Sequence, residues 1–294
     1  MDTSSKALYW HVYQALLPTI WETAECQAIT QQLLKHYLQL DSVSIIIDEP
    51  VTFPLAQRQL VFAAIERLKR QEPIQYVLGE APFLGRNFQV SPAVLIPRPE
   101  TESLVQYIVD QNPQTGARVL DIGTGSGCIA ITLQQELPQT TVYALDVDSE
   151  ALCVAKTNAQ RLGAAVHFIQ ADILHEPLPA QHWDIIVSNP PYVCIAEQKK
   201  MQHRVLAYEP AKALFVPDEQ PLIFYEQIVA LAFQHLAPAG KLYLEINEAF
   251  GTAVADLLIR AGFEAVCIKQ DLHGKDRWIA GTLGVRSRIS NYLN

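Results

Sequence analysis

The sequence contains no apolar run that approaches the roughly 20 residues needed to cross a bilayer, although 49% of its 294 residues are hydrophobic. Residues 1–6 also lack the charged-then-apolar layout of a secretory signal. We therefore expect a cytoplasmic protein with no membrane partner. Only 18% of the residues are charged, and a chain this apolar is expected to fold rather than to remain disordered.

Cysteine is scarce, and its pattern excludes the commonest metal and redox motifs. The five cysteines are odd in number and widely separated, and no two of them form a Cys-x-x-Cys pair. Because they stand in apolar context, we expect reduced residues of the core and no metal site. They are Cys26, Cys128, Cys153, Cys194 and Cys267.

Basic residues are outnumbered, since 22 Lys and Arg against 31 Asp and Glu give a formal net charge of −9. Proteins that bind nucleic acid generally carry a basic stripe, so no stable nucleic-acid partner is expected. Short basic groups are more often solvated surface than binding sites. The local exceptions to the acidic balance are Lys199, Lys200, His203 and Arg204 in one segment and Arg286 and Arg288 in the tail.

Glycine is absent from residues 9–71, where apolar residues recur at helical spacing. A chain of this length is at the size where a single core stops growing, so two domains are expected. Residues 1–74 therefore predict a helical bundle, with residues 41–54 connecting two of its helices. Residues 75–99 hold short apolar runs cut by glycine and proline, which predict a hairpin linker.

From residue 100 onward, β-rich runs alternate with helical ones, which predicts an α/β domain over residues 100–294. The last two runs lie too close together for a helical crossover, so they should pair antiparallel. The expected fold is a Rossmann-like, doubly wound sheet of seven strands, mostly parallel with one antiparallel strand. The predicted strands are residues 118–122, 141–146, 166–170, 183–188, 241–246, 265–268 and 277–282.

The turn after the first of these strands is rich in glycine and consists of Gly123, Thr124, Gly125, Ser126 and Gly127. Glycine lets the backbone approach a ligand closely. A dinucleotide fingerprint would need its third glycine at position 128, where this chain has Cys128. Asp121 would repel a pyrophosphate but attract a cationic sulfonium amino acid. The pattern resembles motif I of the S-adenosylmethionine-dependent methyltransferases.

Two aspartates follow the next strands. Asp146 ends the second strand about 20 residues after the glycines, where a carboxylate can accept hydrogen bonds from both ribose hydroxyls. This position alone does not distinguish S-adenosylmethionine from NAD. By the same resemblance, Asp172 would bind the adenine amino group, with Ile173 against the ring. An aspartate can instead cap a helix, a role that suits Asp148.

The fourth strand runs into Asn189, Pro190, Pro191 and Tyr192. Two successive prolines stiffen the turn and leave carbonyl oxygens free to accept. The Asn189 side-chain oxygen and the Pro190 carbonyl can accept both hydrogens of a planar NH₂ group, while Tyr192 covers its plane. These acceptors raise the electron density on the nitrogen and orient it toward a methyl donor. No strong base is required, because the proton can leave after methyl transfer.

These four residues are thus the predicted substrate site, and Asn189, Pro190 and Tyr192 are the predicted catalytic residues. Asn189 is expected to border the cofactor as well. The tetrapeptide and the glycine turn together resemble amino-methyltransferases that modify a planar nitrogen of adenine, of guanine or of protein glutamine. The tetrapeptide alone does not choose among these substrates.

Other segments resemble the HemK/PrmC release-factor glutamine methyltransferases, and the resemblance covers nearly the whole chain. It implies a class I S-adenosylmethionine-dependent methyltransferase that modifies the amide nitrogen (N5) of the glutamine in the Gly-Gly-Gln motif of class I peptide chain release factors. S-adenosyl-L-methionine would become S-adenosyl-L-homocysteine, and the helical domain would dock the factor. The matching segments are residues 72–79, 90–102, 208–214, 224–228, 244–246 and 271–277.

Some alternatives remain open. An N5-glutamine methyltransferase of a ribosomal protein shares the fold and the Asn-Pro-Pro-Tyr, although by resemblance it differs over residues 96–102. A nucleic-acid amino-methyltransferase would need a basic channel. Arg98 and Glu100 either shape the mouth of the active site and contact substrate or form a structural ion pair. Asn247 stands where the family has glycine, which would suit a left-handed backbone.

Overall fold

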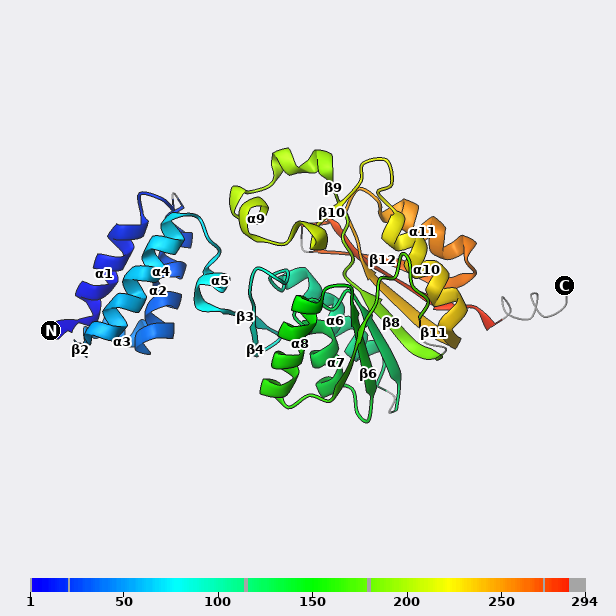
Figure 1. Cartoon of the computed structure of the whole chain (residues 1–294), viewed down its shortest axis with the longest axis horizontal. Helices are drawn as coiled ribbons and strands as arrows, with labels where there is room; N and C mark the ends of the chain where they lie inside the picture. The colour runs from blue at the N-terminus through cyan, green and yellow to red at the C-terminus, as the bar shows by residue number, and fades with distance from the viewer. Residues whose placement is uncertain (1, 21, 114–115, 179–180, 272, 286–294) are drawn as a thin grey trace. The chain divides into compact units, whose positions relative to one another are not determined.

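The structure is a computed structural model that describes residues 2–20, 22–113, 116–178, 181–271 and 273–285. Its contacts divide the chain into two compact units (Figure 1). The first unit holds the chain up to Glu80 and the segment Gln202–Tyr208, and the second holds Ala81–Met201 and the chain from Glu209. Within the described ranges, no helix is long and apolar enough to cross a membrane. Leu272, Arg286 and Arg288 lie outside these ranges.

The first unit is a helical bundle around one apolar core, as the spacing of its apolar residues predicts. Helix α4, for example, buries Val61, Ala64, Ile65 and Leu68, and Figure 1 shows α1, α2 and α4 side by side. The elements of this unit are β1 (Asp2–Ser4), α1 (Ser5–Leu16), α2 (Thr23–Leu38), α3 (Ser42–Ile46), β2 (Pro50–Thr52), α4 (Leu55–Lys69), α5 (Ile74–Leu78) and α9 (His203–Tyr208).

Residues 41–54 are more than the predicted connection. They contain α3, whose first turn is capped by Asp41 Oδ1 accepting from the Ser44 N–H at 2.9 Å. They also contain β2, which pairs antiparallel with β1. Sequence periodicity missed both elements, because each is shorter than the window that periodicity needs.

The second unit is built on a seven-stranded sheet in the order β12-β13-β11-β8-β5-β6-β7. Strand β13 runs antiparallel to β11 and β12, and the other neighbouring strands pair parallel. The predicted mostly parallel sheet with one antiparallel strand is therefore confirmed. Its strands are β5 (Arg118–Ile122), β6 (Thr141–Asp146), β7 (Val166–Gln170), β8 (Trp183–Ser188), β11 (Leu236–Glu245), β12 (Phe263–Gln270) and β13 (Asp276–Leu283).

Helices cover both faces of this sheet. One core packs Leu120 and Ile186 from the sheet with Tyr225 and Leu258 from α10 and α11. The other core packs residues from the opposite face of the sheet against α6, α7 and α8. Successive side chains of a strand point to opposite faces, so each strand contributes to both cores. The helices are α6 (Pro99–Gln111), α7 (Cys128–Glu136), α8 (Ser149–Leu162), α10 (Ile223–His235) and α11 (Gly251–Arg260).

The remaining segments of the second unit are short. The predicted hairpin is present as β3 and β4, which form their own two-stranded sheet. A second small sheet, of β9 and β10, follows the Asn-Pro-Pro-Tyr segment. These segments are β3 (Glu80–Phe83), β4 (Arg86–Gln89), β9 (Val193–Cys194), η1 (Ile195–Lys200), η2 (Ala211–Ala213) and β10 (Phe215–Val216).

All five cysteines are free thiols, but they are not all core residues. Cys26 and Cys128 are buried, Cys194 and Cys267 are half-buried, and Cys153 is exposed. The prediction is wrong for Cys153 because α8 buries Leu152 and Val154 on either side of it and leaves this position on the solvent face of the helix.

The Asn158 side chain ties the hairpin to the sheet domain. Its Nδ2 donates to the carbonyls of Gln89 and Ser126, both at 2.9 Å, and its Oδ1 accepts from the Gln89 N–H at 2.6 Å. Asn158 is fully buried, so one amide satisfies three backbone groups. These contacts join β4, α8 and the glycine turn.

We predict that Asn158→Leu lowers the free energy of unfolding by about 2–4 kcal/mol, because it leaves three backbone polar groups without partners. Urea unfolding measures the change. Gln160→Leu, on the exposed face of the same helix, is the control and should change stability by less than about 0.5 kcal/mol. Equal stability of the two variants would contradict the assigned role of Asn158.

Candidate functional site

The glycine turn, Asp146, Asp172 and Asn189 lie at or just after the carboxyl ends of β5, β6, β7 and β8. Strand β5 lies between β8 and β6, where the strand order reverses, and open α/β sheets bind ligands outside the strand ends at this point. Ile122 pairs with Ser188, and the Ser188 hydroxyl donates to the Ile122 carbonyl at 2.7 Å. The glycine turn and Asn189 therefore begin side by side.

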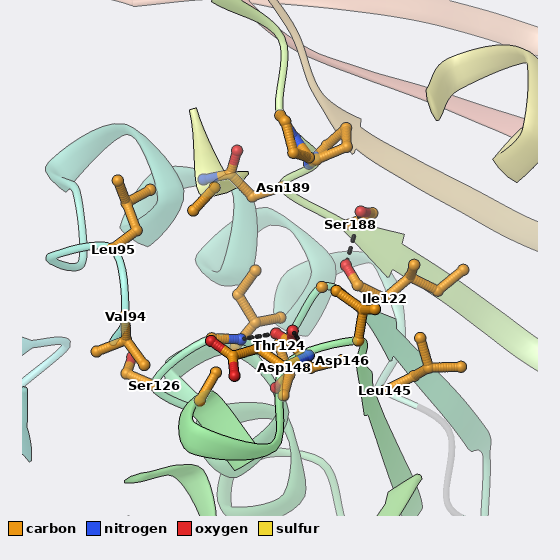
Figure 2. Close-up of a pocket in the computed structure, with 18 of the residues that line it drawn as sticks. Val94, Leu95, Ile122, Thr124, Ser126, Leu145, Asp146, Asp148, Ser188 and Asn189 are labelled. Atoms are coloured by element: carbon orange, nitrogen blue, oxygen red, sulfur yellow. Dashed lines mark hydrogen bonds between the residues drawn. The ribbon is translucent and has the colours of Figure 1, made fainter. Parts of the chain in front are cut away.

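A pocket of the second unit lies at this edge (Figure 2). About 150 Å³ of it can be reached by the centre of a water molecule. Residues 93–98, the glycine turn, the loops after β6 and β7, and Asn189–Pro191 line it. Figure 2 shows Asn189 across the pocket from Asp146 and Asp148. The pocket thus combines residues from the predicted cofactor and substrate motifs.

The glycines of the turn have different surroundings. Gly123, Gly125 and Gly127 have φ values of 72°, 53° and 81°, a region that side chains disfavour. A Cβ built on Gly123 or Gly125 would meet no described atom within 4 Å, and both residues line the pocket. A Cβ on Gly127 would lie 3.0 Å from Ile131 Cδ1. Gly127 therefore permits the packing of α7 and does not line the pocket.

Asp146 holds the turn and faces the pocket. Its Oδ2 accepts from the Gly125 N–H at 2.9 Å, and its Oδ1 accepts from the Asp148 N–H at 3.0 Å. Burial raises the pKa of Asp146 above its usual range, against the lowering effect of these hydrogen bonds. Each carboxylate oxygen has a second lone pair, so Asp146 can still accept from two hydroxyls of a ligand.

Asp148 is a helix cap, as predicted, because its Oδ1 accepts from the Glu150 N–H at 2.9 Å at the start of α8. It also forms an ion pair with Lys212, and both residues line the pocket. Lys212 was not among the sequence predictions, since nothing near it in the chain marks it.

Asp172 and the buried Ile173 both line the pocket. Asp172 Oδ1 accepts from the Leu174 N–H at 2.9 Å, and Oδ2 lies 2.8 Å from His175 Nδ1. These hydrogen bonds lower the pKa of Asp172, with His175 the largest cause. An ionised acceptor beside an apolar side chain suits an aromatic ring that carries an amino group.

Asp121 lies behind the turn, where the structure gives it a supporting position outside the lining of the pocket. It is fully buried, and its Oδ2 accepts from the Thr124 hydroxyl at 2.7 Å. Its Oδ1 has no hydrogen-bond partner within the described ranges. Burial raises the pKa of Asp121 to about 7, although the Thr124 bond lowers it. A cationic ligand above the turn would favour the ionised form.

Asn189 is joined to a buried carboxyl through Thr101. Its Nδ2 donates to Thr101 Oγ1 at 3.2 Å, and the Thr101 hydroxyl donates to Glu245 Oε2 at 2.6 Å. The Tyr192 hydroxyl donates to the other oxygen of Glu245 at 3.1 Å. Burial raises the pKa of Glu245 to about 7, against the lowering effect of both hydroxyls. The ionised form therefore prevails above neutral pH.

Tyr192 does not line the pocket in this structure, unlike Asn189, Pro190 and Pro191. Its hydroxyl is directed to Glu245, and burial raises its pKa well above the usual range. The expectation that its ring covers the substrate plane assumed an exposed side chain, because the sequence shows no partner for the hydroxyl.

Asn247 is not in the left-handed conformation expected for it, since it is absent from the residues with positive φ. Its side chain instead joins the segment after β8 to the end of β11. The Nδ2 donates to the Tyr192 carbonyl at 3.1 Å and to Glu197 Oε1 at 3.0 Å, while its Oδ1 accepts from the Ala249 N–H at 2.9 Å. These contacts explain how asparagine is accommodated here.

Arg98 lines the pocket, and its ion pair is with Glu209 at 2.6 Å rather than with Glu100. Glu209 also accepts from the Ile96 N–H at 3.3 Å, so this pair fixes the segment before α6. Glu100 does not line the pocket. It lies in the first turn of α6, where a negative charge complements the helix N-terminus.

Local sequence patterns do not mark Thr101 or Glu245 as site residues. A carboxylate at the end of an otherwise apolar strand is a signal that could have identified Glu245. Thr101 carries no such local signal, because its partners Asn189 and Glu245 lie 88 and 144 residues away.

Comparisons with known proteins identify two matching domain families and close relatives. Residues 99–216 match the methyltransferase small domain family, and residues 15–79 match the PrmC N-terminal domain family. A protein of Bacteroides thetaiotaomicron named "Release factor glutamine methyltransferase" is 43% identical over 89% of this chain and 94% of its own. One of the same name from Flavobacterium psychrophilum is 40% identical over 90% and 94%. Both similarities extend over nearly the full length of either chain.

A solved structure supports the fold separately. The crystal structure of a methyltransferase from Pyrococcus furiosus matches with a TM-score of 0.51 and 21% identity, over 78% of this chain and 100% of that one. This similarity concerns the fold alone.

We predict that Asn247→Asp lowers the free energy of unfolding by about 2 kcal/mol, because it places a second carboxylate against Glu197 and an acceptor against the Tyr192 carbonyl. Asn247→Gly is the matched control, since it removes the same bonds without adding repulsion. Thermal unfolding of both variants measures the difference. An aspartate variant as stable as the wild type would show that these contacts are unimportant.

Proposed function

Because the chain belongs to the release factor glutamine methyltransferase family, we propose that it methylates the side-chain amide nitrogen (N5) of the glutamine in the Gly-Gly-Gln motif of class I release factors. This reaction would support translation termination. The observation that carries the proposal is the pairing of Ile122 with Ser188. It sets the glycine turn beside an asparagine that can accept from an amide, within one pocket.

The lining of the pocket fits S-adenosylmethionine. Gly123 and Gly125 leave open space above the turn, Asp146 offers free lone pairs for ribose hydroxyls, and Asp172 with Ile173 suits the adenine ring. When bound, the cofactor supplies an electrophilic methyl group on a sulfonium and leaves as S-adenosyl-L-homocysteine. The buried carboxyl of Asp121 adds negative charge below the turn.

Asn189 and Pro190 would activate the substrate amide. The Asn189 Oδ1 and the Pro190 carbonyl would each accept one hydrogen of the glutamine NH₂. An amide nitrogen is a poor nucleophile because its lone pair is delocalised, and two acceptors return electron density to it. The same two bonds hold the nitrogen in line with the methyl group. One N–H proton leaves to water after the transfer.

The first unit would dock a second surface of the release factor. Its exposed apolar side chains support this role, since Trp10, Leu60 and Phe62 are each about half exposed.

A nucleic-acid amine is a weaker candidate substrate. It would need a basic channel, and the segment after the catalytic motif provides little free positive charge, because Arg204 is paired with Glu25. Lys199 and Lys200 are exposed, which is typical of solvated surface charges. A ribosomal-protein glutamine uses the same chemistry, so only a direct assay separates it from a release factor.

The enzyme is incubated with labelled S-adenosylmethionine in parallel reactions that contain a release factor, ribosomal protein or ribosomal RNA. Tandem mass spectrometry then maps the label. We expect one methyl group on the glutamine of Gly-Gly-Gln. Label on the RNA or on ribosomal protein, without label on the release factor, would overturn the assignment.

We predict that Asn189→Ala slows methyl transfer by about 100-fold or more, because one acceptor for the amide is lost. Its Kd for the cofactor should stay within about 3-fold of the wild type. Single-turnover kinetics and titration calorimetry measure the two quantities, with Gln160→Leu as the surface control. An equal loss of the methyl-transfer rate and of the affinity for cofactor would contradict the role given to Asn189.

A further inference from the structure

Three side chains on separate elements form a chain of hydrogen bonds that runs from the lining of the pocket, at Asn189 and Thr101, to the buried Glu245. Asn189 follows β8, Thr101 lies in the first turn of α6, and Glu245 ends β11. Thr101 and Glu245 are both 2% exposed. Solvent therefore has little access to Thr101 and Glu245, whose polar groups must find their partners within the protein, whereas Asn189 is half-buried at the pocket.

The direction of each bond follows from the chemistry of Glu245. An ionised carboxylate only accepts, and Tyr192 already donates to its Oε1. The single hydroxyl hydrogen of Thr101 is therefore directed to Oε2, at 2.6 Å. Toward Asn189, Thr101 Oγ1 is left only with lone pairs. It can accept but cannot donate.

This direction fixes which end of the Asn189 amide faces Thr101. Its Nδ2 must point to Thr101, as it does at 3.2 Å, and its Oδ1 then lies at the opposite end of the planar group. Within the described ranges, no hydrogen bond to this Oδ1 is present. A flipped amide would have nearly the same shape but would place acceptor against acceptor at Thr101.

The orientation matters because the NH₂ of a glutamine amide has only hydrogens to offer. A free Asn189 Oδ1 can accept one of them, whereas a flipped amide would place donor against donor and lose the bond. Asn189 cannot select the correct orientation by its shape, so another group must select it.

We propose that Thr101 and Glu245 are positioning residues that hold the Asn189 amide with its oxygen free to accept from the substrate amide. This inference rests on the proposed function. Thr101 and Glu245 act through Asn189, which is the residue that contacts the substrate.

The test compares Thr101→Val with Thr101→Ser at about pH 8, where Glu245 is ionised. Valine keeps the shape of threonine and removes the hydroxyl, whereas serine keeps the hydroxyl and removes the methyl group. We expect Thr101→Val to lower kcat for release-factor methylation by about 10-fold or more, with the Kd for cofactor unchanged. Thr101→Ser should stay within about 3-fold of wild-type kcat.

A packing role for Thr101 predicts the reverse order, with the valine variant active and the serine variant impaired, and that result would overturn the inference. If Thr101→Val does not fold, Thr101→Ala supplies a second variant without the hydroxyl, and wild-type kcat in that variant would equally overturn it. A wild-type enzyme that leaves release factors unmethylated would instead refute the proposed function.

Discussion

The carboxylate of Glu245 is buried at the end of β11, where it accepts hydrogen bonds from Thr101 and Tyr192. The Tyr225 hydroxyl donates to its backbone carbonyl at 3.2 Å. Through these bonds a single residue joins α6, α10 and the loop after β8. A buried charge is costly unless it is fully hydrogen-bonded, so the burial of Glu245 makes the two bonds to its carboxylate obligatory. The position of the loop after β8 depends on them.

The sheet supplies the second constraint. Parallel pairing of β5 with β8 and β6 sets Ile122 beside both Ser188 and Leu145. The loops after β5, β6 and β8 therefore start at the same edge of the sheet. This placement brings the predicted cofactor and substrate motifs together. Asp146 fixes the glycine turn from one side and Asn158 from the other. The pocket is therefore held by side chain-to-backbone hydrogen bonds at the glycine turn and by a side-chain network at Asn189.

Sequence patterns predicted the strands of the seven-stranded sheet, the antiparallel β13, the glycine turn and the cap at Asp148, because each of these depends on neighbours in the chain. They did not predict what depends on distant partners. Arg98 pairs with Glu209, and Tyr192 turns to Glu245. Asn247 forms bonds to Tyr192 and Glu197 without a left-handed backbone. Such contacts join segments that only the folded sheet brings together.

The most direct test is a double-mutant cycle between Thr101 and Asn189. Single-turnover rate constants for methylation of a release factor are measured for the wild type, Thr101→Val, Asn189→Ala and the double variant, with enzyme in excess. If Thr101 acts only by orienting Asn189, replacing it in the Asn189→Ala background causes no further loss. Losses that multiply in the double variant would contradict this account.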